Sequence, residues 1–257
     1  MTPRRVLVTG ASGFVGRPAV EALLARGFEV HAIGRCPRGL PDGVAASLRL
    51  YRAFAASGGK RLVVAGTCAE YDWTADVLDE ATTPIRPGTL YGTAKDALHR
   101  ILATAAPQDG ISMAWGRLFF MYGPREAPGR LVPDVAQALL RGQPALCGPG
   151  TAERDFMHVA DVGGALAATL DSTHVGPVNI ATGACVPVRT LVQTLADLIG
   201  RPELVRLGAC PAPKDEPARL AASVTVLRES IGFTPRFALA DGLADTLVWW
   251  RDRVAQR

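Results

Sequence analysis

A chain of 257 residues can bury the core of one large domain, or of one domain with a smaller lobe. Its net charge of +4 comes from dispersed arginines, which excludes a basic stripe following nucleic acid and suits small anionic substrates better. The apolar run beginning at Val6 leaves no room for a signal peptide, and no 18-residue apolar stretch spans a membrane, so we expect a cytoplasmic protein.

The sulfur and imidazole side chains give no sign of a metal centre. The five cysteines are scattered without a CxxC pair, as expected of small buried residues in a reducing compartment. The four histidines lack the HExxH spacing or any other spacing typical of metal ligands. We therefore expect no metal site.

The first predicted elements form a β-turn-α-β unit. Residues 5–9 (RVLVT) are a short apolar run, typical of a parallel strand buried on both faces. The segment RPAVEALLARG, residues 17–27, has the apolar spacing of an amphipathic helix that ends at Gly27. A second strand follows at residues 28–34 (FEVHAIG), and this order opens an α/β fold.

The turn between the first strand and the first helix reads GASGFVG, a G-x-x-G-x-x-G pattern. Glycines permit the tight turn and a close backbone approach to a pyrophosphate, and the helix N-terminus offers free N–H groups. The alternative is a glycine-rich turn that binds nothing; its position at the first βα turn favours dinucleotide binding. The predicted cofactor-binding residues here are Gly10, Ser12, Gly13, Phe14, Val15 and Gly16.

The end of the second strand bears on the choice of cofactor. An acidic residue there would bind the ribose 2′-OH of NAD, but this chain has Gly34-Arg35, with Arg38 nearby. A cation suits the 2′-phosphate of NADP, so we expect NADP, with NAD as the second choice. The alternative is that Arg35 stacks on the adenine or faces solvent.

The later elements continue an α/β pattern without an internal repeat. A helix near 44–57 precedes a strand at 61–67, and a polar loop at 68–88 leads to the next helix. The remaining expected elements are a strand within 111–120, a helix near 131–142, a loop GPGTAERDF, a helix near 160–171, a strand PVNIA, and helices near 188–200 and 239–254.

The helix after the polar loop carries Tyr91 and Lys95, four positions apart and therefore on one helical face. A phenol is a poor base at neutral pH, but an ammonium group nearby favours the phenolate and lowers its pKa. Thr67 ends the third strand, at the sheet edge where ligands bind in open parallel sheets. We predict Thr67, Tyr91 and Lys95 as catalytic residues, the last two also touching the cofactor.

Together TGASGFVG, Thr67, YGTAK, GRLFFMYGP, RDFMHVADV and PVNIATG occur in the order found in one family. The set resembles the extended short-chain dehydrogenases/reductases, in the NAD-dependent epimerase/dehydratase branch, most of whose members act on nucleotide sugars. The resemblance implies that Tyr91 donates or accepts the proton, Lys95 orients the nicotinamide ribose and Thr67 positions the sugar oxygen. It also implies that Arg154 grips the nucleotide pyrophosphate; the alternative is a surface ion pair with Asp155.

Three sites in the sequence depart from the family pattern. Cys68-Ala69 follow Thr67 where dehydratases have Asp-Glu, which disfavours 4,6-dehydration. Phe120 replaces an asparagine that often contacts substrate. Ala212 replaces a nucleotide-binding arginine, and Arg219 is the candidate substitute for substrate binding.

The largest departure is a missing segment. A full Rossmann domain has two more βα units before the strand ending at Thr67, but only residues 36–60 are available. Removing those strands from order 3-2-1-4-5-6 leaves 2-1-5-6, the beginning of the flavodoxin-like order 2-1-3-4-5. We therefore expect a doubly wound, mostly parallel Rossmann-like sheet in shortened form, with a smaller C-terminal α+β substrate lobe.

The expected division is 1–118 plus 155–181 for the dinucleotide-binding domain, and 119–154 plus 182–257 for the substrate-binding lobe. The expected activity is NAD(P)-dependent oxidation–reduction or epimerisation of a nucleotide-linked sugar, a 4-keto sugar reductase being favoured over an epimerase. The alternatives are a non-catalytic nucleotide-binding remnant and a reductase of a non-nucleotide carbonyl substrate. The helices near 44–57 and 90–105 resemble those of the family's dimer interface, which implies a homodimer.

Overall fold

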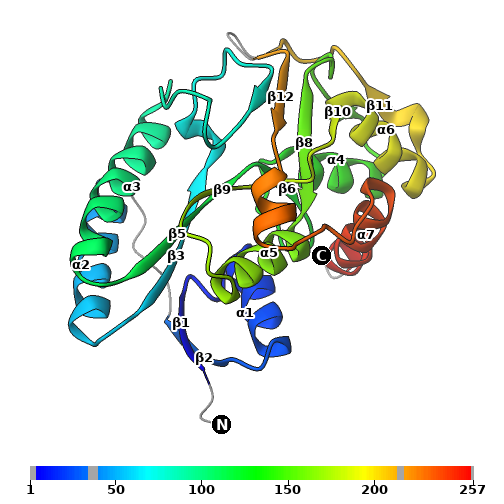
Figure 1. The fold of residues 1–257 in the computed structure, drawn as a ribbon. Coiled ribbons are helices and arrows are strands. Elements are labelled where there is room, and N and C mark those ends of the chain that lie inside the picture. Colours follow the sequence, from blue (N-terminus) through cyan, green and yellow to red (C-terminus); the bar gives the residue numbers. More distant parts are fainter. Residues whose placement is uncertain (1–3, 34–39, 213–216, 256–257) are drawn as a thin grey trace.

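The computed structural model describes residues 4–33, 40–212 and 217–255. Two parallel pieces of sheet with helices against them form one half of the molecule, and a smaller lobe of mixed strands and helices forms the other (Figure 1). This confirms the predicted α/β Rossmann-like architecture.

The first βαβ unit forms as predicted. Strand β1 (Arg5–Thr9), helix α1 (Gly16–Ala25) and strand β2 (Glu29–Ile33) follow one another, and β1 pairs with β2 in parallel. The expected burial of β1 on both faces is wrong, because Leu7 is 43% exposed and no residue of the strand is fully buried. In a full Rossmann domain, the two βα units that this sequence lacks would cover the exposed face of β1.

The second piece of sheet carries the strand predicted to end at Thr67. Strands β3 (Arg61–Thr67), β5 (Ser112–Leu118) and β9 (Gly176–Ile180) pair in parallel in the order β3-β5-β9. Between β3 and β5 the chain forms helix α3 (Leu90–Gln108). The parallel register puts the carboxyl ends of all three strands at one edge.

The two pieces are not joined by strand pairing among the described residues. The expected order placed β1 beside β3, but β1 pairs with β2, and β3 pairs with β5. Within each piece the strands follow the predicted order, β2-β1 in one and β3-β5-β9 in the other. The continuous sheet predicted from topology is therefore not formed among the described residues.

Helices cover both faces of the β3-β5-β9 sheet (Figure 1). On one face α2 (Leu40–Ala56) and α3 pack around Trp115, a fully buried residue of β5. On the other face lies α5 (Val159–Asp171), which contributes Val162 and Ala165 to the cluster around β9. Helix α1 packs on α5, so α5 links the first βαβ unit to the larger sheet.

The smaller lobe holds the remaining elements and a second core. Strand β8 (Glu153–His158) is its centre and pairs with β6 (Phe120–Tyr122), β10 (Cys185–Pro187) and β12 (Arg219–Ala222); β12 also pairs with β4 (Val77–Leu78). Strand β7 (Ala145–Leu146) pairs with β11 (Val205–Arg206). Helices α4 (Leu131–Leu140), α6 (Val188–Ile199) and α7 (Leu239–Ala255) enclose the second core.

Two loop predictions in this region are wrong. The end of GPGTAERDF belongs to β8, because its residues pair with strands on both sides. The polar loop at 68–88 contains a 3₁₀ turn at Cys68–Glu70 and the short strand β4. Both strands are set by long-range pairing, which local residue preference does not report.

Candidate active site

The phosphate loop has the conformation that its glycines predict. Gly10 adopts φ +66°, and the N–H of Gly13 donates to the carbonyl of Gly10 at 2.8 Å. A Cβ on Gly16 would lie 2.0 Å from that same carbonyl oxygen, so only glycine fits there. Ser12 and Gly13 are exposed at the start of α1. The residues present therefore fit a dinucleotide pyrophosphate.

The electrostatics beside this loop are positive. Ser12 lines a cavity of about 340 Å³ together with Arg17, Arg125, Arg141 and Arg253. Arg17 also donates through Nε to the carbonyl of Ser12 at 3.2 Å. Glu126 lines the cavity as well, but burial raises the pKa of its carboxyl to about 7, so the four arginines outweigh it and favour an anionic ligand. Arg35, on which the NADP prediction depends, lies outside the described residues, as does Arg38.

The structure brings Thr67 and Tyr91 together. Thr67 ends β3 and is 8% exposed, and Tyr91, 45% exposed, lies at the start of α3, near enough that the Thr67 side chain lowers the pKa of its phenol. Gly92 makes this approach possible, because a Cβ there would lie 2.2 Å from the carbonyl oxygen of Ala69. Thr89 caps α3 by accepting from the N–H of Gly92 at 3.1 Å.

The protonation of Tyr91 differs from the expectation. Burial raises the pKa of Tyr91 above its ordinary value of 10.0, and the hydrogen bond from Thr67 opposes the rise only in part. The charge of Glu70 also raises the pKa, whereas Arg130 lowers it. Tyr91 is therefore a protonated phenol at neutral pH, ready to donate a proton.

Lys95 lies one helical turn after Tyr91 and contacts the third strand. Its Nζ donates to the carbonyl of Ala65 in β3 at 2.8 Å. The lowering of the Tyr91 pKa that we expected from this ammonium group is not the net result. Thr67 and Tyr91 thus lie near the carboxyl end of β3, and Lys95 contacts the strand two residues earlier; their catalytic roles stay a prediction.

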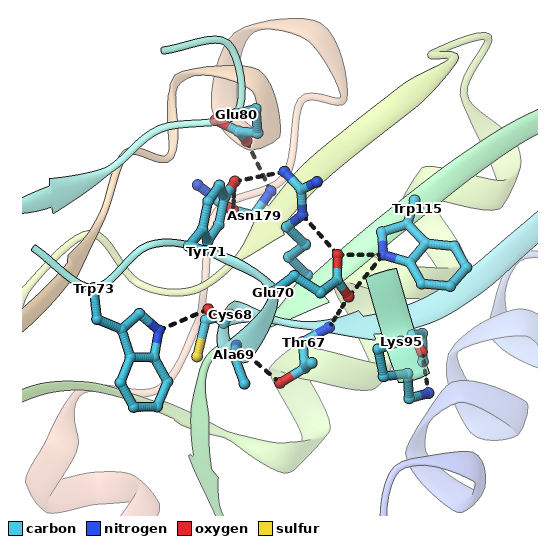
Figure 2. A network of polar contacts seen from close by, with 12 residues as sticks. Thr67, Cys68, Ala69, Glu70, Tyr71, Trp73, Glu80, Lys95, Trp115 and Asn179 are labelled. Atoms are coloured by element: carbon cyan, nitrogen blue, oxygen red, sulfur yellow. Dashed lines mark hydrogen bonds and ion pairs between the residues drawn. The ribbon is translucent and has the colours of Figure 1, made fainter. Parts of the chain in front are cut away.

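Sequence reasoning missed one residue beside this group, Glu70. Its carboxylate accepts from the N–H of Thr67 at 2.8 Å and is fully buried beneath the strand end (Figure 2). The signal was present: T-C-A-E matches the capping-box pattern, in which a glutamate reaches back to the N-cap N–H. Without attention to that pattern, a charged residue in a polar loop is expected to be exposed to solvent, and for this reason Glu70 was missed.

The predicted substrate arginines have different surroundings. Arg154 is 2% exposed, so the alternative of a surface ion pair is wrong. Its Nη1 donates to the carbonyl of Glu153, and its guanidinium lies 5.4 Å from the ring centroid of Phe120. Arg219 is exposed, and its Nη1 lies 3.6 Å from a carboxylate oxygen of Glu153.

Neither a metal centre nor a membrane span is found in the described ranges. No group of three or more His, Cys, Asp or Glu side chains there could hold a metal ion. Among those same residues, no helix combines the length and apolar character needed to cross a bilayer.

Comparison with known proteins found a matching family model and related solved structures. The model of the "NAD dependent epimerase/dehydratase family" matches residues 6–43 and 40–181. MoeE5, solved in complex with UDP-glucose and NAD, is 31% identical, with a TM-score of 0.83 over 98% of this chain and 99% of that chain.

Two curated relatives are similar over part of their length. A dTDP-glucose 4,6-dehydratase of Streptomyces griseus is 29% identical over 189 residues, 73% of this chain and 56% of the relative. UDP-glucuronic acid decarboxylase 1 of Arabidopsis thaliana is 22% identical, over 97% of this chain and 70% of the relative. That alignment runs over 309 positions, more than the 257 residues of this chain, so the relative carries internal residues that this chain lacks.

Proposed function

This chain belongs to the NAD dependent epimerase/dehydratase family, and on that premise we propose that it is an NAD(P)-dependent oxidoreductase acting on a nucleotide-linked sugar. The observation that carries the proposal is the placement of Thr67, at the carboxyl end of β3, beside Tyr91 at the start of α3, with Lys95 one turn further along that helix against β3. The family relatives named above act on or bind nucleotide sugars, which supports this substrate class.

Reduction of a 4-keto sugar is the favoured direction. When bound, the nicotinamide supplies the hydride. Tyr91, a protonated phenol at neutral pH, donates its phenolic proton to the carbonyl oxygen as that oxygen gains charge. Thr67 holds the same oxygen, and the ammonium group of Lys95, one turn further along α3, favours the resulting phenolate. An epimerase would need the reverse proton transfer as well, which a raised pKa disfavours.

The residues that would hold the cofactor are those of the phosphate loop together with Tyr91 and Lys95. The exposed Ser12 and Gly13 at the N-terminus of α1 suit the pyrophosphate. NADP remains the prediction from Arg35, with NAD as the second choice; MoeE5 was solved with NAD. Calorimetric titration with NADPH and NADH measures both affinities directly.

The test of the catalytic role is Tyr91→Phe. We expect this change to lower the rate of NADPH oxidation with nucleotide 4-keto sugars by about 10²–10⁴-fold, the usual contribution of a positioned proton donor, while cofactor affinity stays near wild type. Tyr51→Phe is the matched control, since Tyr51 lies on α2 and bonds Asp109 instead. Equal turnover by the Tyr91 variant would refute the role.

A non-catalytic nucleotide-binding protein is the second candidate, favoured by the break between β1 and β3. Calorimetry separates the two functions, because no binding at millimolar cofactor would rule out the oxidoreductase. Binding without turnover on any nucleotide keto sugar would favour the second candidate.

A homodimer through α2 and α3 is part of the proposal. Helix α3 exposes Leu90 at 73% and Ile101 at 46%, which a partner subunit would cover. We expect light scattering at micromolar concentration to give twice the mass of one chain, and Ile101→Asp to shift that mass toward the monomer. A wild-type monomer under those conditions would exclude this interface.

A further inference from the structure

The turn that follows β3 is held from beneath by a buried carboxylate. Glu70 lies three residues after Thr67, and its side chain folds back to accept from the N–H of Thr67 at 2.8 Å. Thr67 in turn accepts from the N–H of Ala69 at 3.3 Å through its hydroxyl. These two bonds form a capping box, which fixes the conformation of the strand end that carries Thr67 (Figure 2).

Two side chains of β5 hold the carboxylate. The indole Nε1 of Trp115 donates to both of its oxygens at 3.0 Å, and Nε of Arg117 donates to Oε2 at 3.0 Å. Glu70 is 0% and Arg117 2% exposed as side chains. A Cβ on Gly66 would lie 2.0 Å from the indole nitrogen and 2.7 Å from Oε1, so the glycine in β3 leaves room for this arrangement.

The Glu70–Arg117 ion pair is also held on the side of Arg117 that faces away from Glu70. Nη1 of Arg117 donates to the hydroxyl of Tyr71 at 2.9 Å, and that hydroxyl donates to Oδ1 of Asn179 at 2.9 Å. The amide of Asn179 donates to the carbonyls of Leu78 and Ser223. The network therefore runs from the end of β3 through β5 and β9 to the segment beside β12.

A buried ion pair is weak evidence for stability, because apolar residues of similar volume often replace one without loss. The geometry of the Glu70–Arg117 pair indicates a role in positioning Thr67 rather than in stability. Every donor that the carboxylate accepts from lies on the strand end or on the neighbouring strand, so the charge fixes Thr67 relative to β5.

We propose that Glu70, held by Arg117 and Trp115, is a positioning residue that sets the hydroxyl of Thr67 against the phenol of Tyr91. This inference rests on the proposed function. It predicts that removing the carboxylate loosens the Thr67–Tyr91 pair while leaving the cofactor loop unchanged.

The ionisation of Tyr91 reports on this arrangement without any substrate. The charges facing Tyr91 are those of Glu70, which raises its pKa, and of Arg130, which lowers it; the Cys68 thiol, whose own pKa burial raises to about 12, is uncharged at neutral pH, and Lys95 lies one turn away on the same helix. Loss of the Glu70 charge alone lowers the pKa of Tyr91, whereas loosening the contact with Thr67 raises it, so Glu70→Gln by itself does not isolate positioning. Adding Thr67→Val separates the two effects: if Glu70 positions Thr67, Thr67→Val raises the pKa of Tyr91 in the wild-type background and has little effect in Glu70→Gln.

The measurement is ¹⁹F NMR of protein labelled with 3-fluorotyrosine, whose ring fluorine brings the titration to a lower pH. The chain has four tyrosines, and Tyr91→Phe assigns the signal of Tyr91. Burial raises the pKa of Tyr51 and of Tyr71 to about 12 each, so these two titrate at the upper end of the range. We expect Thr67→Val to lower the ionisation constant of Tyr91 by about threefold or more in the wild-type background and to leave it nearly unchanged in Glu70→Gln.

The matched control is Glu80→Gln, the same change in a carboxylate that accepts from the N–H of Asn179. In the Glu80→Gln background Thr67→Val should raise the pKa of Tyr91 as it does in the wild type. An equal effect of Thr67→Val in the wild-type and in the folded Glu70→Gln background would overturn the proposal. Failure of wild-type turnover would refute the proposed function alone, since the titration needs no substrate.

A second variant covers the case in which Glu70→Gln does not fold. Glu70→Gln with Arg117→Met removes both charges, so no uncompensated charge is buried. We expect this double variant to keep the wild-type KM within about threefold while kcat falls about tenfold or more, the pattern of an interaction used in the transition state. Wild-type kcat in the double variant would overturn the positioning role.

Discussion

At the scale of single residues, the neutral imidazole of His99 supports the network around Glu70 from the helix side. His99 lies on α3 and stacks on Trp115, with ring centroids 4.7 Å apart. Burial, together with the nearby charge of Arg117, lowers the pKa of His99 to about 4. The ring is therefore uncharged at neutral pH, which keeps a second positive charge away from the Glu70–Arg117 pair.

This makes His99 a source of acid sensitivity. Between about pH 6.5 and pH 4 the unfolded chain binds a proton at His99 that the folded protein does not, so stability falls as the pH falls through this window. After solvent screening of this partly exposed ring, we expect the loss to be about 1 kcal/mol.

The variant that tests this is His99→Phe, which keeps an aromatic ring against Trp115 but cannot titrate. Its Tm should fall less than the wild-type Tm between pH 7 and pH 4.5, by about 2–4 °C. Thermal melts at the two pH values measure the difference. Parallel Tm losses in both proteins would show that His99 contributes nothing to acid sensitivity.

Much of the candidate site could be predicted at this scale, because Thr67, Tyr91 and Lys95 follow from strand and helix positions. Glu70 could not be assigned, since its role depends on Trp115 and Arg117, about 45 residues further along the chain. Arg154 was predicted to bind a ligand, but its burial against Phe120 depends on tertiary packing that no local pattern contains.

At the scale of elements, the contact between α1 and α5 determines where the phosphate loop sits. Gly163 of α5 lies directly beneath the start of α1, because a Cβ there would be 2.5 Å from the backbone nitrogen of Ala19 and from the carbonyl carbon of Pro18. Backbone atoms cannot move aside to relieve such a clash, as the end of a flexible side chain can. The absence of a side chain at Gly163 thus permits the close helix pair that carries the loop.

Two neighbouring substitutions separate packing from helix propensity. Gly→Ala in a helix interior gains about 1 kcal/mol of propensity at either position. At Gly164 the new methyl group would meet only the ring of Phe233, at 3.0 Å, which can turn aside. At Gly163 it would push α1 away, an overpacking cost of about 1–3 kcal/mol.

We therefore expect Gly163→Ala to have a Tm about 2–4 °C below that of Gly164→Ala, and to bind NADPH about tenfold more weakly. Thermal melts and calorimetric titration of the two variants check both values. Equal cofactor affinities would mean that α5 does not position the loop.

Most helices and long strands could be predicted to within a few residues, because their apolar periodicity is local. Strands β4 and β8 were not, since short strands in polar segments are determined by the partners they meet. The β8 pairings with β6, β10 and β12 bring together segments far apart in the chain.

At the scale of the whole molecule, the outstanding feature is a parallel sheet formed in two pieces. The sequence predicted both the missing βα units and the order of the strands that remain. It could not predict whether β1 and β3 would pair, because pairing depends on the spacing that the neighbouring helices impose. In the structure α1 and α5 set that spacing, and the described residues form no ladder between the two strands.

The break in the sheet has a thermodynamic consequence. The loop that would bind the dinucleotide and the residues that would use its nicotinamide belong to pieces linked by helix packing rather than by a continuous ladder. A dinucleotide contacting both would itself bridge them, and its binding free energy would stabilise their docking. By ligand linkage, cofactor at a hundred times its Kd would add about 2.7 kcal/mol. Cofactor supply would then regulate the assembly of the site as well as its turnover.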